Sequence, residues 1–178
     1  MCAYGPCGVT VIYLLMLMSS ICIASASAQE LASQQQRIPL PDIYYANVIA
    51  PLLPVIEEIT RLPVPHELPV VYLAPREYIE KLYCSPKTAY CGVAAVTDEL
   101  TGEITLSSGL SPGNLLGISV IFHELVHWAQ IKNHLFDDEA DCAHWAKREM
   151  HAYTAQSRFL DAHGVHGFHV PDLLSSCR

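Results

Sequence analysis

The segment from residue 111 to 133 carries a repeat that is typical of a helix buried on one face. Its apolar side chains recur at steps of three and four residues, namely Leu115, Ile118, Phe122, Leu125 and Ala129. Ser111 and Pro112 suit the start of this helix. The repeat contains the stretch HELVH, in which His123 and His127 stand one turn apart on the same side of the helix. A helix that packs only through apolar side chains has no need of such a pair, which therefore indicates a bound ligand.

The spacing within HELVH is that of half a hydrolytic metal site. Two imidazoles on one side of a helix can each give one nitrogen to the same zinc ion. Glu124 follows His123 and is rotated by about 100° around the helix, which places it beside the metal rather than in its coordination shell. A carboxylate in that position can act as the general base that takes a proton from water. The motif therefore predicts His123 and His127 as zinc ligands and Glu124 as the catalytic base.

A catalytic zinc ion usually has three protein ligands, so a third must come from elsewhere in the chain. The continuation HExxHxxGxxH is excluded, because Gln130 and Asn133 stand where it needs glycine and histidine. The remaining continuation uses a glutamate on a second helix, predicted for residues 137–164, and Glu149 lies there, 22 residues after the motif. Cys142 lies on the same predicted face as Glu149, so a thiolate ligand is an alternative. An oxidising compartment favours a disulfide for that cysteine instead.

The stretch HELVHWAQ, followed by Glu149, Ala152 and Tyr153, resembles the gluzincins, the HExxH zinc peptidases whose third ligand is a downstream glutamate. The glutamate helix of that family often reads Glu-x-x-Ala followed by an aromatic or polar residue. The resemblance is closest to small exported bacterial proteins of unknown function with a minimal gluzincin-like domain, and it covers roughly residues 90–160. It implies that Glu149 completes the zinc site and that the protein is a zinc metallopeptidase acting on a peptide or protein.

The resemblance does not assign the side chain that stabilises the transition state. Tyr153 lies one turn after Glu149 on the same helical side, so it can donate a hydrogen bond to the oxyanion or orient a ligand. A tyrosine that only fills the core is the alternative. His144 and His151, on the same predicted helix, are expected to face solvent. Tyr153 is therefore a candidate catalytic residue beside Glu124.

The order of predicted elements indicates an α+β fold. Helical spacing covers residues 42–62, 75–84, 111–133 and 137–164, and strand-like runs cover residues 68–74, 90–97 and 103–108. Pro51 and Pro54 are expected to kink or split the first helix. We expect residues 42–178 to form a small zincin-like domain, with a short sheet and a hairpin beside the active-site helix and the glutamate-bearing helix. The resemblance also implies that the strand at residues 103–108 lines the cleft, with an edge that can pair with an extended peptide.

Residues 1–28 have the features of a signal peptide. A long apolar run ends in the tripeptide ASA, a small-x-small cleavage pattern. No lysine or arginine precedes Arg37, so a retained membrane anchor is the alternative. The polar, glutamine-rich stretch at residues 29–41 predicts a flexible linker. We therefore expect a secreted or periplasmic protein with no stable membrane association once the signal peptide is cleaved.

The charges and cysteines fit an exported protein. The net charge of −8 arises entirely beyond Gln29 without a basic stripe to offset it, which argues against nucleic acid as a partner. Four cysteines follow the apolar segment, and an even number in an exported chain indicates two disulfides with three possible pairings. We favour Cys84–Cys91, which closes a local loop, and Cys142–Cys177, which anchors the C-terminal tail.

The sequence thus predicts an exported zinc-dependent hydrolase, a metallopeptidase in which zinc and Glu124 activate water. The alternative is an exported binding or interaction module that keeps zinc as a structural device. An intact Glu124 favours the enzyme, because structural zinc does not require a base at that position.

Overall fold

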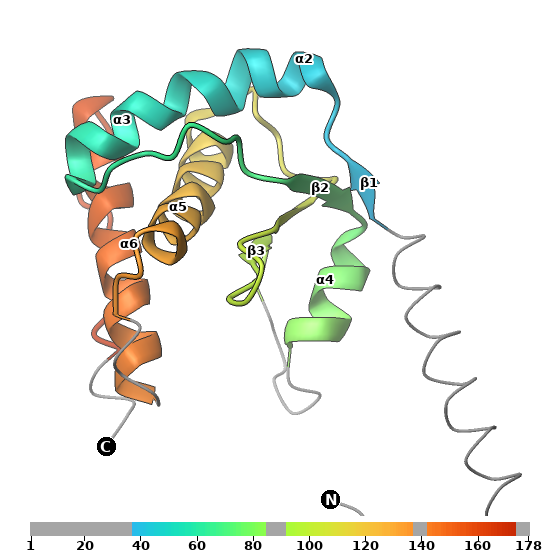
Figure 1. Cartoon of the computed structure of the whole chain (residues 1–178). Helices are drawn as coiled ribbons and strands as arrows, with labels where there is room; N and C mark the ends of the chain where they lie inside the picture. The colour runs from blue at the N-terminus through green and yellow to red at the C-terminus, as the bar shows by residue number, and fades with distance from the viewer. Residues whose placement is uncertain (1–36, 85–91, 137–141, 174–178) are drawn as a thin grey trace, which may run out of the picture. The chain divides into compact units, whose positions relative to one another are not determined.

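A computed structural model, which describes residues 37–84, 92–136 and 142–173, confirms the α+β fold (Figure 1). Its helices are α2 (Asp42–Tyr44), the π-helical η1 (Tyr45–Ile49), α3 (Ala50–Thr60), α4 (Arg76–Tyr83), α5 (Leu115–Lys132) and α6 (Cys142–Ala162). Its strands are β1 (Ile38–Pro39), β2 (Val71–Ala74), β3 (Ala95–Thr97) and β4 (Ile104–Ser107). Within the described ranges, every helix is too short or too polar to cross a lipid bilayer.

The end of the predicted linker belongs to the fold. Ile38 and Pro39 form β1, which pairs antiparallel with β2, and Leu40 is buried in the core. Prolines on either side of Leu40 fix an extended backbone that suits the edge of a sheet. The predicted signal peptide and the rest of the linker lie outside the described residues. The same holds for Cys91 and Cys177, so the two disulfide pairings stay a prediction that peptide mapping without reduction can test.

The first helical segment is not broken by its prolines. The elements α2, η1 and α3 follow one another without a gap, and Pro51 and Pro54 both lie within α3. A proline has no N–H to donate to the carbonyl four residues before it. The wider turn of η1 lies directly before Pro51, where such a donor is missing. A change of helical pitch therefore replaces the predicted kink or split.

The sheet has four strands in the order β1-β2-β4-β3. β2 and β4 pair in parallel, whereas β3 and β4 form an antiparallel hairpin with Gly102 in its turn at φ +73°. β4 is therefore paired on both sides, and all four of its residues are buried. The expectation that the strand at residues 103–108 offers an edge to a peptide is wrong, because β2 occupies that edge. β3 ends the strand order, with one side not paired by any described strand.

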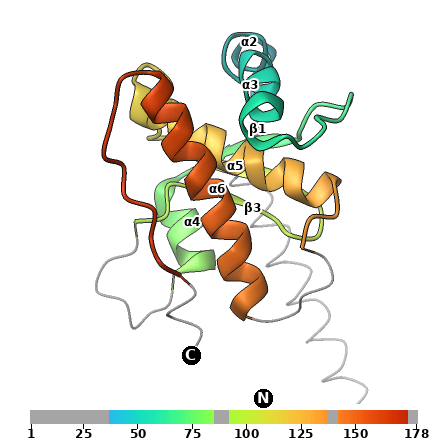
Figure 2. The same cartoon turned by 90° about the vertical axis from the view of Figure 1, so that its left-hand side faces the viewer.

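Every residue of α5 from Ile121 to Gln130 is buried. Figure 1 shows α5 between the sheet and α6, and Figure 2 shows α6 crossing α5. Phe122 of α5 stacks on Phe159 of α6, with the ring centroids 4.6 Å apart. This aromatic contact holds together the two helices that carry the predicted metal ligands.

The helix α5 begins at Leu115, after a cap that differs from the predicted one. The side chain of Asn114 accepts a hydrogen bond from the N–H of Gly117 at 2.7 Å, so Asn114 and not Ser111 is the N-cap. The preceding loop folds back so closely that a Cβ on Gly117 would lie 1.9 Å from the carbonyl oxygen of Ser111. Glycine at position 117 therefore permits the loop that leads into the helix.

Candidate metal centre

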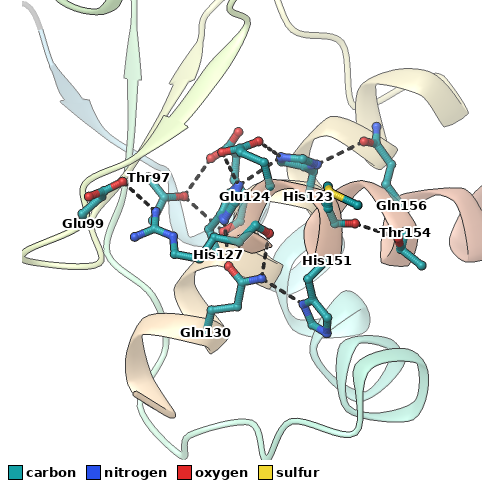
Figure 3. A network of polar contacts seen from close by, with 12 residues as sticks. Thr97, Glu99, His123, Glu124, His127, Gln130, His151, Thr154 and Gln156 are labelled. Carbon is teal, nitrogen blue, oxygen red and sulfur yellow. Dashed lines mark hydrogen bonds and ion pairs between the residues drawn. The ribbon is translucent and has the colours of Figure 1, made fainter. Parts of the chain in front are cut away.

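Three side chains from two helices converge on one point, and Figure 3 shows the two that α5 contributes, His123 and His127. His123 and His127 lie one turn apart on α5, with their Nε2 atoms 3.1 Å from each other. Glu149 of α6 directs one carboxylate oxygen toward each ring, at 3.4 Å from Nε2 of His123 and 3.1 Å from Nε2 of His127. One donor atom from each of the three residues lies within 4.8 Å of the others, and both histidines are buried. The three predicted ligands thus form one cluster that can hold a metal ion.

A chain of hydrogen bonds orients the ring of His123. Its Nδ1 faces Oε1 of Gln156 at 3.2 Å, the amide nitrogen of Gln156 donates to Oγ of Ser119 at 3.0 Å, and that hydroxyl donates to the carbonyl of Leu116 at 2.8 Å. A backbone carbonyl can only accept, so the direction of the whole chain is set from that end. The Nδ1 of His123 therefore carries a proton, and the lone pair of the neutral ring lies at Nε2, facing the cluster.

A second chain orients the ring of His127. Its Nδ1 lies 2.9 Å from Oε1 of Gln130, whose amide nitrogen donates to the carbonyl of Arg148 at 3.0 Å. The same argument as for His123 places the proton of His127 on Nδ1 and a lone pair on Nε2. The amide nitrogen of Gln130 also lies 2.9 Å from Nδ1 of His151. We expected His151 to face solvent, but it is half-buried beside Gln130. Burial and the charge of His127 lower the pKa of His151.

The cluster needs positive charge at its centre. Burial by itself lowers the pKa of His127, but the hydrogen bond and charge of Glu149 and the charge of Glu124 outweigh burial, so this pKa is raised. Burial raises the pKa of Glu149, but its contacts with the imidazoles of His123 and His127 lower it by more, so the carboxyl stays ionised far below its usual range. Nitrogen lone pairs and carboxylate oxygens that face one another at this range require either protons or a cation between them.

Glu124 borders the cluster without belonging to it. Oγ1 of Thr97, on β3, lies 2.8 Å from Oε2 of Glu124 and 3.1 Å from its backbone carbonyl oxygen. This contact ties the predicted catalytic base to the strand at the end of the sheet. Glu124 and the three cluster residues line one pocket of about 940 Å³, whose walls include β3 and the adjoining face of α6.

Tyr153 and Arg148 of α6 line the same pocket. The ring of Tyr153 lies against that of His123, with the centroids 4.5 Å apart. Burial raises the pKa of Tyr153, and the charges of Glu149 and Glu124 raise it further, so its hydroxyl keeps its proton. Arg148 is 7% exposed, and its Nη2 forms an ion pair with Oε1 of Glu99, in the turn between β3 and β4, at 2.9 Å.

Comparison with known proteins yields a family but no function. The sequence profile of the family "Domain of unknown function (DUF6647)" matches residues 44–170, which is more than half of the chain. The chain belongs to this family. No curated protein and no solved structure matches it. The matched range contains the whole cluster and both series of hydrogen bonds that orient the histidines, so the candidate metal centre lies within the DUF6647 domain.

The sequence did not predict a role at the site for Gln130, Gln156, Thr97 or Arg148. Gln130 follows His127 by three positions and Gln156 follows Glu149 by seven, so helical spacing already puts each glutamine on the ligand side of its helix. A glutamine amid an apolar helical repeat is the signal that could have found them. Thr97 and Arg148 gave no such signal, because their contacts depend on how β3 sits against the two helices. The described metal-ligating cluster does not include Cys142, the alternative ligand.

Replacing Gln156 with alanine is expected to weaken zinc binding by roughly 10–100-fold, the usual effect of losing a partner behind a ligand histidine. The loss follows because the Nδ1 proton of His123 then has no acceptor, and the ring can rotate or change tautomer. Competition against a chromogenic chelator measures the affinity. Gln156→Glu keeps an acceptor at that place, so this variant should bind zinc more tightly than Gln156→Ala. Thr154 is exposed on the same helix, so Thr154→Ala should bind zinc as tightly as the unchanged protein. Unaltered affinity in Gln156→Ala would contradict this role.

Proposed function

We propose that this chain is an exported zinc-dependent hydrolase that cleaves peptide bonds in a peptide or protein. The observation that carries the proposal is the convergence of His123, His127 and Glu149 on one pocket, with Glu124 beside them. The apolar segment at residues 1–28 supports export to the periplasm or the medium.

The spacing of the donor atoms supports zinc as the metal. In a tetrahedral site with bonds of about 2.0–2.1 Å, neighbouring donors lie roughly 3.3 Å apart. In the cluster the two Nε2 atoms are 3.1 Å apart, and each faces a different carboxylate oxygen of Glu149, Oε1 at 3.1 Å from His127 and Oε2 at 3.4 Å from His123. Two imidazoles and one carboxylate leave a fourth position open, as in catalytic zinc sites. A zinc ion bound there would supply a Lewis acid that polarises a carbonyl group and acidifies water.

Glu124 has the position that a general base needs. Its carboxylate lines the same pocket but is not one of the three ligand groups, so it is available for proton transfer. The hydroxyl of Thr97 donates to Oε2 of Glu124 at 2.8 Å and so fixes the orientation of the carboxylate. A carboxylate held in this way can take a proton from water and deliver it to the leaving amine.

Tyr153 and β3 supply the remaining parts of the proposed site. The protonated hydroxyl of Tyr153 can donate a hydrogen bond to the oxyanion that forms at the attacked carbonyl. The side of β3 that no described strand pairs, at Ala95–Thr97, lines the pocket and can take up an extended peptide as an additional strand. A peptide bound to β3 would then run past the cluster, between Glu124 and Tyr153.

Replacing Tyr153 with phenylalanine is expected to lower kcat by roughly 100-fold, the usual cost of losing one oxyanion donor, with little change in KM. The change keeps the ring that packs against His123 and removes only the hydroxyl. Zinc content serves as the control and should not change. A variant that keeps the full kcat would leave Tyr153 with a packing role only.

The proposal as a whole is tested by incubating the purified protein with a diverse peptide library, with and without a chelator. We expect cleavage that the chelator abolishes and added zinc restores. If the zinc-loaded protein cleaves none of the peptides, the peptidase function is wrong, and zinc would serve a binding module.

A further inference from the structure

We infer that the pocket selects substrates that carry a carboxylate, which binds to Arg148 in place of Glu99. This inference rests on the proposed function and names the substrate class of the same site. The exchange involves no covalent step: the guanidinium of Arg148 changes its partner from a carboxylate of the protein to one of the substrate.

Among the described residues, Arg148 has an N–H donor without a hydrogen-bond partner. Among the described residues that line the pocket, it is the single lysine or arginine, beside four carboxylates. The helix α6 places it next to the ligand Glu149 and leaves it 7% exposed. Only its Nη2 forms a described ion pair, and its Nε is buried without a hydrogen-bond partner in the structure. A guanidinium has five N–H donors and can bind both oxygens of one carboxylate, so Arg148 can accommodate a better partner than it has.

Glu99 is a partner that can be displaced. Its side chain is 58% exposed, and it lies in the turn between β3 and β4. Release from Arg148 costs the carboxylate of Glu99 little, because water solvates this exposed group nearly as well. Arg148, in contrast, is buried on a helix. When a competing carboxylate enters the pocket, Glu99 can therefore turn toward solvent while Arg148 stays in place.

The burial of Arg148 decides which charge the pocket accepts. A substrate carboxylate that replaces Glu99 keeps the buried cation paired and can add an acceptor for its unused donors. A substrate amine that bound Glu99 would instead leave the buried guanidinium unpaired, which is strongly unfavourable. The N–H groups of Leu100 and Thr101 donate to Oδ1 of Asp98 at 3.0 Å and 2.8 Å, so this carboxylate is stabilised without a substrate amine. The pocket therefore favours an anionic substrate group.

The carboxylate can come from a chain terminus or from an acidic side chain, and matched peptides distinguish the two sources. Three N-acetylated peptides share one cleavable sequence. The first ends in a free carboxylate, the second in an amide, and the third in an amide with one residue replaced by aspartate. The kcat/KM of each peptide is measured with the zinc-loaded protein and with its Arg148→Gln and Glu99→Gln variants.

We expect at least one carboxylate peptide to exceed the neutral peptide by roughly 10–100-fold in kcat/KM, as charge-assisted hydrogen bonds predict. The preferred peptide identifies the source of the carboxylate. Arg148→Gln should bring this ratio close to one, whereas Glu99→Gln, an exposed change, should raise it several-fold by removing the competing carboxylate. A purely structural ion pair would leave the ratio unchanged in both variants. Equal cleavage of all three peptides by the unchanged protein, or a lower ratio in Glu99→Gln, would overturn the inference.

Binding without turnover separates this inference from the proposed function. The same peptides are titrated by calorimetry into zinc-loaded protein carrying Glu124→Gln. If no peptide is cleaved by the unchanged protein but the carboxylate peptides bind selectively to this variant, the hydrolase proposal fails while the inference stands. If peptides are cleaved but binding does not distinguish the carboxylate, the inference fails alone.

Discussion

Replacing Glu124 with glutamine is expected to reduce peptide hydrolysis by roughly 100-fold or more, while the zinc content stays that of the unchanged protein. Glutamine has nearly the same size and still offers an oxygen to the hydroxyl of Thr97, but it cannot take a proton from water. Zinc should remain bound because Glu124 is not a member of the ligand cluster. The measurement is kcat at saturating peptide, with zinc determined by mass spectrometry on the same sample.

A matched control is available on another helix. Glu80 of α4 pairs with Arg76 at 2.7 Å and does not line the pocket, so Glu80→Gln makes the same chemical change away from the site. This variant should keep full activity. Full activity in Glu124→Gln, in an assay that a chelator still abolishes, would show that another group acts as the base.

Replacing Glu149 with alanine is expected to weaken zinc binding more than Gln156→Ala does, for which the expected loss is roughly 10–100-fold. Two histidines alone leave the ion under-coordinated, whereas Gln156 acts only through one of those histidines. The affinity is measured by competition with a chelator, and circular dichroism shows whether the variant is folded. His151→Ala is the control, because His151 lies two residues away and contacts Gln130 rather than the cluster. If Glu149→Ala keeps its zinc and His151→Ala loses it, the third ligand has been assigned to the wrong residue.

The cluster was predictable because its parts are local or carry a recognisable motif. The positions of His123, Glu124 and His127 follow from the turn of one helix alone. Glu149 lies on another helix, and spacing along the chain does not place it against the histidines. Its assignment came from the resemblance to the gluzincins, and the structure brings it within 3.4 Å of both rings.

The errors concern features that depend on distant parts of the chain. Both Ser111 and Asn114 can cap a helix, and the loop that folds closely over Gly117 accompanies the use of Asn114. The resemblance to the gluzincins implied that the strand at residues 103–108 offers an edge to a peptide. This strand became the centre of the sheet because β2, about 30 residues earlier, pairs with it in parallel. Register between distant strands is not encoded in local spacing.

The contacts that orient the two histidines also depend on distant parts of the chain. The contact of Gln156 with His123 and that of Gln130 with His127 and Arg148 exist only because α6 crosses α5 at one position, which the stacking of Phe122 on Phe159 helps to fix. The pairing of Arg148 with Glu99 likewise needs the β3–β4 turn to reach α6. These contacts explain how the fold orients the ligands, and a single sequence does not display them.

The claim on which the account depends is that His123, His127 and Glu149 together hold a zinc ion. The most direct measurement is the metal content of the purified protein after zinc loading and dialysis, beside a variant that combines His123→Ala with His127→Ala. We predict about one zinc ion per chain in the unchanged protein, as for a single three-ligand site, and far less in the folded double variant. A double variant that keeps one zinc ion per chain, or an unchanged protein that takes up none, would contradict the account.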